Sequence, residues 1–128
     1  HPLLLVRLAR MEAALALADD KLEELAQAGQ RQADIARAAG LLEPLAEALL
    51  LQACAATQQS SRMPLLQEAA ALADMQGFAD LAWRAHGGLD GSIQPSALDT
   101  SKARQDGNAQ PVRARISKAS SVQGLPYQ

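Results

Sequence analysis

Apolar residues recur along residues 1–90 at the spacing of amphipathic helices. The first stretch, Leu3–Ala18, has an apolar stripe with a period close to 3.6, made of Leu4, Leu8, Met11, Leu15 and Ala18. A second helix is predicted over Lys21–Ala39. Asp20 and Glu23 have the spacing of a capping box at its start, and Gly40 supplies a left-handed stop at its end.

The second predicted helix has one polar face, formed by Glu24, Gln27, Arg31, Asp34 and Arg37. Its apolar stripe is narrower, with Leu22, Leu25, Ala28, Ile35 and Ala39. Gly29 in its interior costs roughly 1 kcal/mol relative to alanine, so we interpret it as a place where another backbone comes close.

The third stretch, Leu41–Thr57, is apolar on nearly every side, with Pro44 in its first turn. A helix of this kind must be covered all round by other helices or by lipid. Since Glu43, Pro44 and Glu47 leave an uninterrupted run well below the roughly 20 apolar residues of a membrane span, we predict a central helix in a helical array.

Two further helices are predicted before residue 90. Arg62–Met75 follows a polar break, with Ser60 or Ser61 as its cap and Pro64 in its first turn. A short helix, Phe78–His86, closes the array, and Gly87, Gly88 and Gly91 interrupt the chain after it. The prediction is therefore an all-α domain of about five helices over residues 1–90.

Residues 91–128 have the composition of a polar, weakly basic linker or tail with irregular structure. Val112, Ala114 and Ile116 alternate with polar residues, which is a strand pattern. Since residues 1–90 offer no sheet edge, such a strand would pair only with another chain or with another part of the tail.

Composition adds a core of leucine and alanine, because 48% of the chain is hydrophobic and only 2% is aromatic. Twelve Lys and Arg against fourteen Asp and Glu give no global basic field, so nucleic acid is an unfavourable partner for the chain as a whole. The single cysteine, Cys54, lies in the most apolar stretch and fits a structural thiol in a reducing cytoplasm. With His1 first and no signal peptide, we interpret the chain as part of a longer cytoplasmic protein, or as one trimmed after a tag.

The sequence contains few residues in the patterns typical of catalytic or metal-binding sites. Glu43 and Glu47 lie one helical turn apart, but no ligand set accompanies them, so a solvated face is the better interpretation. His86 is better explained as a favourable charge at a helix carboxyl end than as a ligand. We therefore predict a non-enzymatic protein with no metal or cofactor.

Four residues are candidates for contacting a partner: Arg31, Arg62, Trp83 and Arg84. Arg31 lies on the polar face of the second helix. Trp83 either packs over the core, the favoured alternative, or forms an exposed hot spot. Arg62 and Arg84 either form a small basic spot beside it or, as is more usual for two exposed arginines, serve only solubility. The basic tail residues Arg113, Arg115 and Lys118 fit a polar linker better than a phosphate contact.

Helix pairs recur at a spacing near 40 residues, the scale of helical repeats whose pairs stack to bury a shared face. Three runs, Leu22–Gly40, Leu41–Thr57 and Pro64–Gly88, resemble the tetratricopeptide-like region of the large ATP-dependent, LuxR-type bacterial transcription regulators related to the maltose activator. Arg62, Arg84 and the terminal AHGG depart from the pattern of that family.

The resemblance implies stacked antiparallel helix pairs that sense an effector or dock a regulatory protein and that self-associate. It also implies an ATPase and a DNA-binding domain elsewhere, since the chain has neither a phosphate-binding GxxxxGK[ST] loop nor a recognition helix. DNA would then be contacted only through a domain outside this chain. The alternative is a tetratricopeptide-like scaffold or dimerisation module with no small-molecule ligand, and a weaker one is an accessory domain of a ligand-binding enzyme.

Overall fold

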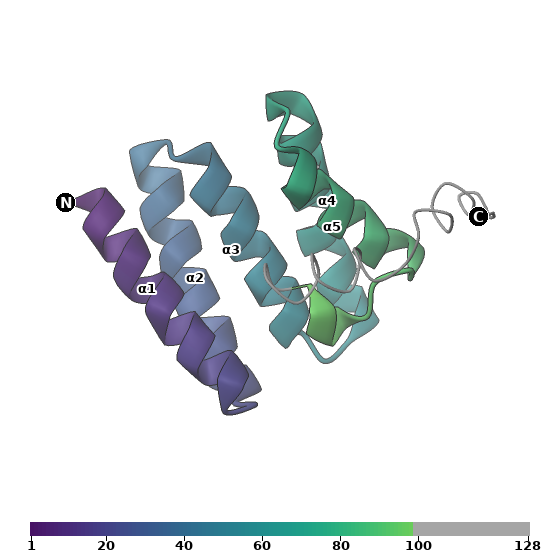
Figure 1. Ribbon diagram of the computed structural model, residues 1–128, viewed down its shortest axis with the longest axis horizontal. Coiled ribbons are helices and arrows are strands. Elements are labelled where there is room, and N and C mark those ends of the chain that lie inside the picture. Colours follow the sequence, from purple (N-terminus) through teal and green to yellow (C-terminus); the bar gives the residue numbers. More distant parts are fainter. Residues whose placement is uncertain (99–128) are drawn as a thin grey trace.

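Residues 1–98 are described by a computed structural model, and they form an all-helical array (Figure 1). Five α-helices and a short 3₁₀ helix follow in order: α1 (Pro2–Ala18), α2 (Leu22–Ala39), α3 (Leu42–Ala55), α4 (Gln59–Gln76), α5 (Ala79–Asp90) and η1 (Pro95–Ala97). The predicted all-α class with about five helices is confirmed. The possible strand at Val112–Ile116 lies outside the described residues.

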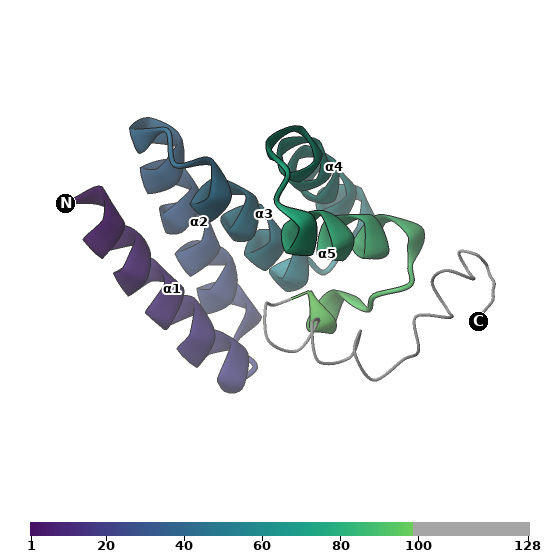
Figure 2. The ribbon, with the colours of Figure 1, turned by 45° about the horizontal axis from the view of Figure 1, so that its top comes forward.

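Consecutive helices pack against one another in antiparallel fashion, α1 on α2, α2 on α3, α3 on α4 and α4 on α5 (Figure 2). Helix α3 also contacts α5 and η1, so it occupies the middle of the array. Within residues 1–98, no helix has both the length and the apolar character needed to cross a membrane.

The turns after α1, α2 and α4 share one geometry. Each has a residue with positive φ just past the helix, Asp20 at 57°, Gly40 at 71° and Gly77 at 78°. The next amide donates back to a carbonyl in the last helical turn, as from Lys21 to Ala16, which satisfies a carbonyl that the helix leaves open. The predicted capping box at Asp20 is wrong, because Asp20 takes the left-handed position and α2 has no side-chain cap.

Helix α3 is buried as predicted, with nine residues in the core: Leu45, Ala46, Ala48, Leu49, Leu50, Leu51, Ala53, Cys54 and Ala55. The predicted close approach at Gly29 is also present. A Cβ at Gly29 would lie 3.3 Å from the Gln52 backbone nitrogen and 3.4 Å from the Ala48 carbonyl oxygen. Helices α2 and α3 therefore pack almost backbone to backbone.

Helix α1 turns its small residues inward. The four side chains buried against α2 are Val6, Ala9, Ala13 and Ala16. The apolar stripe that identifies this helix in the sequence, Leu4, Leu8, Met11, Leu15 and Ala18, is exposed on the opposite side. The helix thus has two apolar faces, and the alanine face packs inward because it lets the two helices approach closely.

The second half of the array departs from the prediction at two helix boundaries. Helix α4 begins at Gln59 after Gln58, without a serine cap, so Pro64 lies inside it rather than in its first turn. Helix α5 does not stop at His86 but runs through Gly87 and Gly88 to Asp90.

Gly87 and Gly88 are packing positions rather than interruptions. A Cβ at Gly87 would lie 2.3 Å from Ile93 Cδ1, and one at Gly88 would meet Leu66 and Leu98 at 3.0–3.1 Å. Ile93, Ala97 and Leu98 are buried in the common core. The packed region therefore reaches Leu98, beyond the change of composition at residue 91.

Candidate functional site

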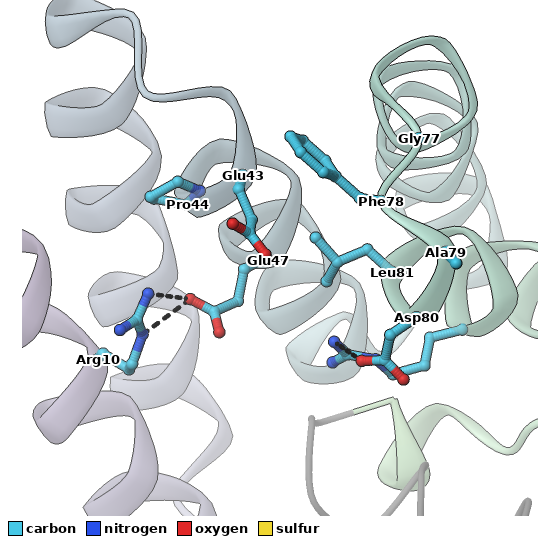
Figure 3. Close-up of a pocket in the computed structure, with 10 residues that line it drawn as sticks. Arg10, Glu43, Pro44, Glu47, Gly77, Phe78, Ala79, Asp80 and Leu81 are labelled. Carbon is cyan, nitrogen blue, oxygen red and sulfur yellow. Dashed lines mark hydrogen bonds and ion pairs between the residues drawn. The ribbon is translucent and has the colours of Figure 1, made fainter.

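A cleft of about 410 Å³ opens between the start of α3 and the turn from α4 to α5 (Figure 3). Helix α1 contributes one side chain to it. The lining residues are Arg10, Glu43, Pro44, Glu47, Gly77, Phe78, Ala79, Asp80, Leu81 and Arg84. The cleft exists because α3 leaves α2 after the Gly40 turn while the Gly77 turn redirects the chain into α5 on the far side.

One wall carries the two carboxylates of the first turns of α3. Glu47 accepts hydrogen bonds from Arg10 Nε at 2.8 Å and from Gln32 Nε2 at 2.9 Å, and its side chain is only 17% exposed. Gln32 also donates to the Pro44 carbonyl oxygen at 2.9 Å. Within residues 1–98, Glu43 is exposed and makes no ion pair or hydrogen bond, so it is the carboxylate available to a ligand.

This network corrects the interpretation of Glu47 as part of a solvated face. Gln32 is fully buried, and its Oε1 has no hydrogen-bond partner within the described residues. The network joins α1, α2 and α3 at one point, because Arg10, Gln32 and Glu47 come from the three helices in turn. The wall of the cleft is therefore held in place by three helices.

The other wall is apolar above and polar below. Figure 3 shows the Phe78 ring and the Leu81 side chain facing the α3 wall across the gap. Below them, Arg84 donates from Nη2 to Asp80 Oδ2 at 2.7 Å within α5. Each of the two arginines in the cleft pairs with a carboxylate, so Glu43 leaves the lining with one negative charge in surplus.

Arg84 does not form an exposed basic spot, which corrects the prediction for this residue. It is 2% exposed, pairs with Asp80, and donates to the Leu98 carbonyl oxygen over a long 3.4 Å contact. Its Nε finds no partner within residues 1–98. The residue therefore links the segment after α5 to the core and also lines the cleft.

Arg62 is also used inside the fold. It donates from Nε to the Ala53 carbonyl oxygen at 3.2 Å and from Nη2 to the Ala56 carbonyl oxygen. These carbonyls lie at and just past the end of α3, where helical partners run out, and the Ala53 carbonyl oxygen also accepts a bond from the Ala56 amide at 3.3 Å. Arg62 thus caps α3 from the first turn of α4, and it does not stand beside Arg84 as a pair of free cations.

The other two predicted contact residues lie apart from the cleft. Arg31 pairs with Glu12 across the α1–α2 seam, and both side chains are about half exposed. Trp83 is partly buried and packs against the core, in agreement with the favoured alternative for this residue. Of the four predicted residues, only Arg84 lines the cleft.

The ionisable side chains that line the cleft are carboxylates and arginines. Its lining contains no histidine, cysteine, serine or lysine. His86 lies inside α5, where its Nε2 is 2.8 Å from Asp74 Oδ2 on α4, so the predicted role at a helix end is wrong. Across residues 1–98, no group of three or more His, Cys, Asp or Glu side chains could hold a metal ion.

The residues that sequence reasoning missed are Arg10, Phe78 and Asp80. Each looked like an ordinary surface or core position, because the cleft joins segments about 30 to 70 positions apart. A partial signal was present in Gly77, since a left-handed stop followed by an aromatic residue marks a turn that directs a large side chain away from the helix.

No family model, curated protein or solved structure matches the chain.

Proposed function

We propose that this chain is a non-enzymatic helical-repeat module that holds a segment of a protein partner in the cleft between α3 and the α4–α5 turn. The observation that carries the proposal is the lining itself, in which an unpaired carboxylate, Glu43, faces an apolar wall of Phe78 and Leu81. A lysine or arginine next to a large apolar side chain is the ligand chemistry that this pairing fits.

The wider context of the proposal is a cytoplasmic bacterial transcription regulator. It rests on the resemblance of Leu22–Gly40, Leu41–Thr57 and Pro64–Gly88 to the helical-repeat region of the LuxR-type regulators. In such a protein, an occupied cleft favours one stacking of the helices over another and passes that bias to a DNA-binding domain outside this chain. A small effector in the cleft would act in the same way.

The alternative function is a scaffold or dimerisation module with no small-molecule ligand. The exposed leucine face of α1 favours it, because monomers rarely expose a contiguous apolar patch of this kind without using it. A metabolite library screened by thermal unfolding at fixed protein concentration separates the two. Stabilisation by one compound supports sensing, whereas a melting temperature that depends only on protein concentration supports assembly.

Selection of random peptides displayed on phage against the chain tests the peptide-binding proposal directly. We expect the enriched peptides to place Lys or Arg beside a large apolar residue. The substitution Glu43→Gln should weaken binding of a selected peptide at least about tenfold, because a charged hydrogen bond is lost.

The matched control is Glu68→Gln, which removes an exposed carboxylate from α4 outside the cleft. This control should leave the affinity unchanged. The proposal is contradicted if no peptide is enriched over an empty surface, or if both variants lower the affinity equally.

A further inference from the structure

The outer face of α1 carries a heptad pattern that no helix within residues 1–98 covers. Define the outer stripe as Leu4, Leu8, Met11, Leu15 and Ala18, which alternate in steps of four and three residues. Steps of four and three place these residues at the a and d positions of a coiled-coil seam. The four large side chains are 50–68% exposed, although leucine and methionine are core residues by preference.

The inward face of the same helix is already in use. Val6, Ala9, Ala13 and Ala16 are buried, and all of them lie at the b and f positions opposite the seam. Rotating α1 to bury the leucines would therefore expose the alanine face and replace a close contact with α2 by a bulky one. Within residues 1–98, the outer stripe therefore stays exposed.

Charges beside the outer stripe distinguish between the possible occupants. Arg7 lies at a g position and Glu12 at the e position five residues later, on opposite flanks of the stripe. In a parallel pair of identical helices, g of one helix meets the following e of the other, so Arg7 faces Glu12 twice by symmetry. An antiparallel pair of the same helices would bring like flank to like flank.

The area of the outer stripe also suits a second copy. With Leu5 at an adjoining e position it forms a patch on the order of 500 Å², at the upper end of the apolar patches on monomers. Two such patches bury on the order of 1,000 Å², which is the lower limit for a specific interface. Because α1 is already folded on α2, association of two chains does not lose free energy to helix formation.

We infer that the outer stripe of α1 is the contact surface for a second copy of this chain, packed as a short parallel two-stranded coiled coil. The seam consists of Leu4, Leu8, Met11 and Leu15 from each chain, and Arg7 of each copy pairs with Glu12 of the other, whose carboxylate is then shared with Arg31 of its own chain. The inference does not rest on the proposed peptide-binding cleft, to which α1 contributes Arg10 but no residue of the outer stripe.

Sedimentation equilibrium of the full chain over a range of concentrations tests the inference. We expect the mass to rise from 13.5 kDa toward twice that value. Leu8→Glu should raise the dissociation constant at least about tenfold, because a carboxylate then replaces a central apolar contact. Helical content by circular dichroism should stay unchanged, since Leu8 contributes an exposed side chain to the single chain.

The parallel orientation has its own test in disulfide formation. Identical a positions face each other only in a parallel pair, so Leu8→Cys should oxidise to a covalent dimer much faster than Glu68→Cys on α4. Arg7→Glu should weaken association, and adding Glu12→Arg should restore it.

Three outcomes would overturn the inference: a mass of 13.5 kDa at every concentration, an unchanged mass on Leu8→Glu, or equal oxidation rates of the two cysteine variants. The first would indicate that a different protein or another helix of a longer chain covers the stripe.

Discussion

Helices α1 and α3 are both strongly apolar, yet they meet opposite environments. Helix α3 packs against α2 on one side and α4 on the other, and Leu49 is 2% exposed. Helix α1 packs mainly against α2 and reaches α3 through the Arg10–Glu47 pair, and Leu15 is 68% exposed. The difference shows that the apolar content of a helix indicates how much of its surface needs to be buried. The position of the helix in the array decides which of its faces this chain buries.

The two helices also use leucine and alanine differently. In α3 both residue types are buried, with leucines filling the space toward the neighbouring helices. In α1 the inward face consists of Val6 and three alanines while most of the leucines are exposed, so the contact with α2 is close but small in side-chain volume. The stability of the array should therefore depend far more on α3 than on α1.

Truncating one leucine in each helix gives the largest expected contrast. Leu49→Ala should lower the free energy of unfolding by about 2–5 kcal/mol, because it leaves a cavity in the middle of the array. Leu15→Ala should change it by less than about 0.5 kcal/mol, since its side chain is exposed. Urea unfolding at a concentration where the chain is monomeric measures both, and equal losses would contradict the comparison.

Much of this architecture is readable from the sequence, because helix periodicity and glycine stops are local signals. The full coverage of α3 and the close approach at Gly29 followed from residue types alone. The orientation of α1 did not, since both of its faces are apolar and periodicity cannot choose between them. Choosing the buried face of α1 requires knowing that its alanine face fits the surface of α2, and that fit depends on tertiary structure.

The candidate cleft was less predictable than the fold. Arg62 and Arg84 looked like surface cations, but each finds backbone carbonyl groups, and those acceptors are created by the way α3 ends and by the segment after α5. Arg10 joins the cleft only because α1 and α3 flank α2 on neighbouring sides. Such contacts depend on several elements at once and leave no pattern in any one of them.

The close contact between α2 and α3 can be tested by adding a side chain at Gly29. Gly29→Val should destabilise the fold by about 1–3 kcal/mol, because a Cβ there would already lie 3.0 Å from Gln52 Cγ and 3.3–3.4 Å from backbone atoms of Gln52 and Ala48, which cannot turn away. The control, Ala71→Val on the exposed side of α4, should cost only the difference in helix propensity, about 0.5 kcal/mol. Thermal and urea unfolding compare the two variants, and a Gly29→Val protein as stable as the control would show that α2 and α3 can separate freely.

The network that ties α1 to α3 should have an intermediate effect. Glu47→Gln keeps an oxygen for Gln32 but removes the charge that Arg10 binds, so we expect a loss of about 1–2 kcal/mol. Arg10 is about half exposed and can turn to water, which limits the cost. Urea unfolding beside Glu68→Gln, whose exposed pair with Arg37 should contribute less than 0.5 kcal/mol, provides the comparison. If the two variants lower the free energy of unfolding equally, the Glu47 network contributes no more than an exposed surface ion pair.

The ion pair between Arg31 and Glu12 should have the smallest effect of the four, although it spans the seam between α1 and α2. Both side chains are about half exposed, so water screens the charges and the pair should contribute about 0.2–1 kcal/mol. A double-mutant cycle with Arg31→Ala and Glu12→Ala measures the coupling, and added salt should reduce it further. A coupling above about 1.5 kcal/mol that persists in high salt would mean that this ion pair, rather than the alanine face, holds α1 on α2. That result would contradict the explanation given above for how α1 and α3 differ.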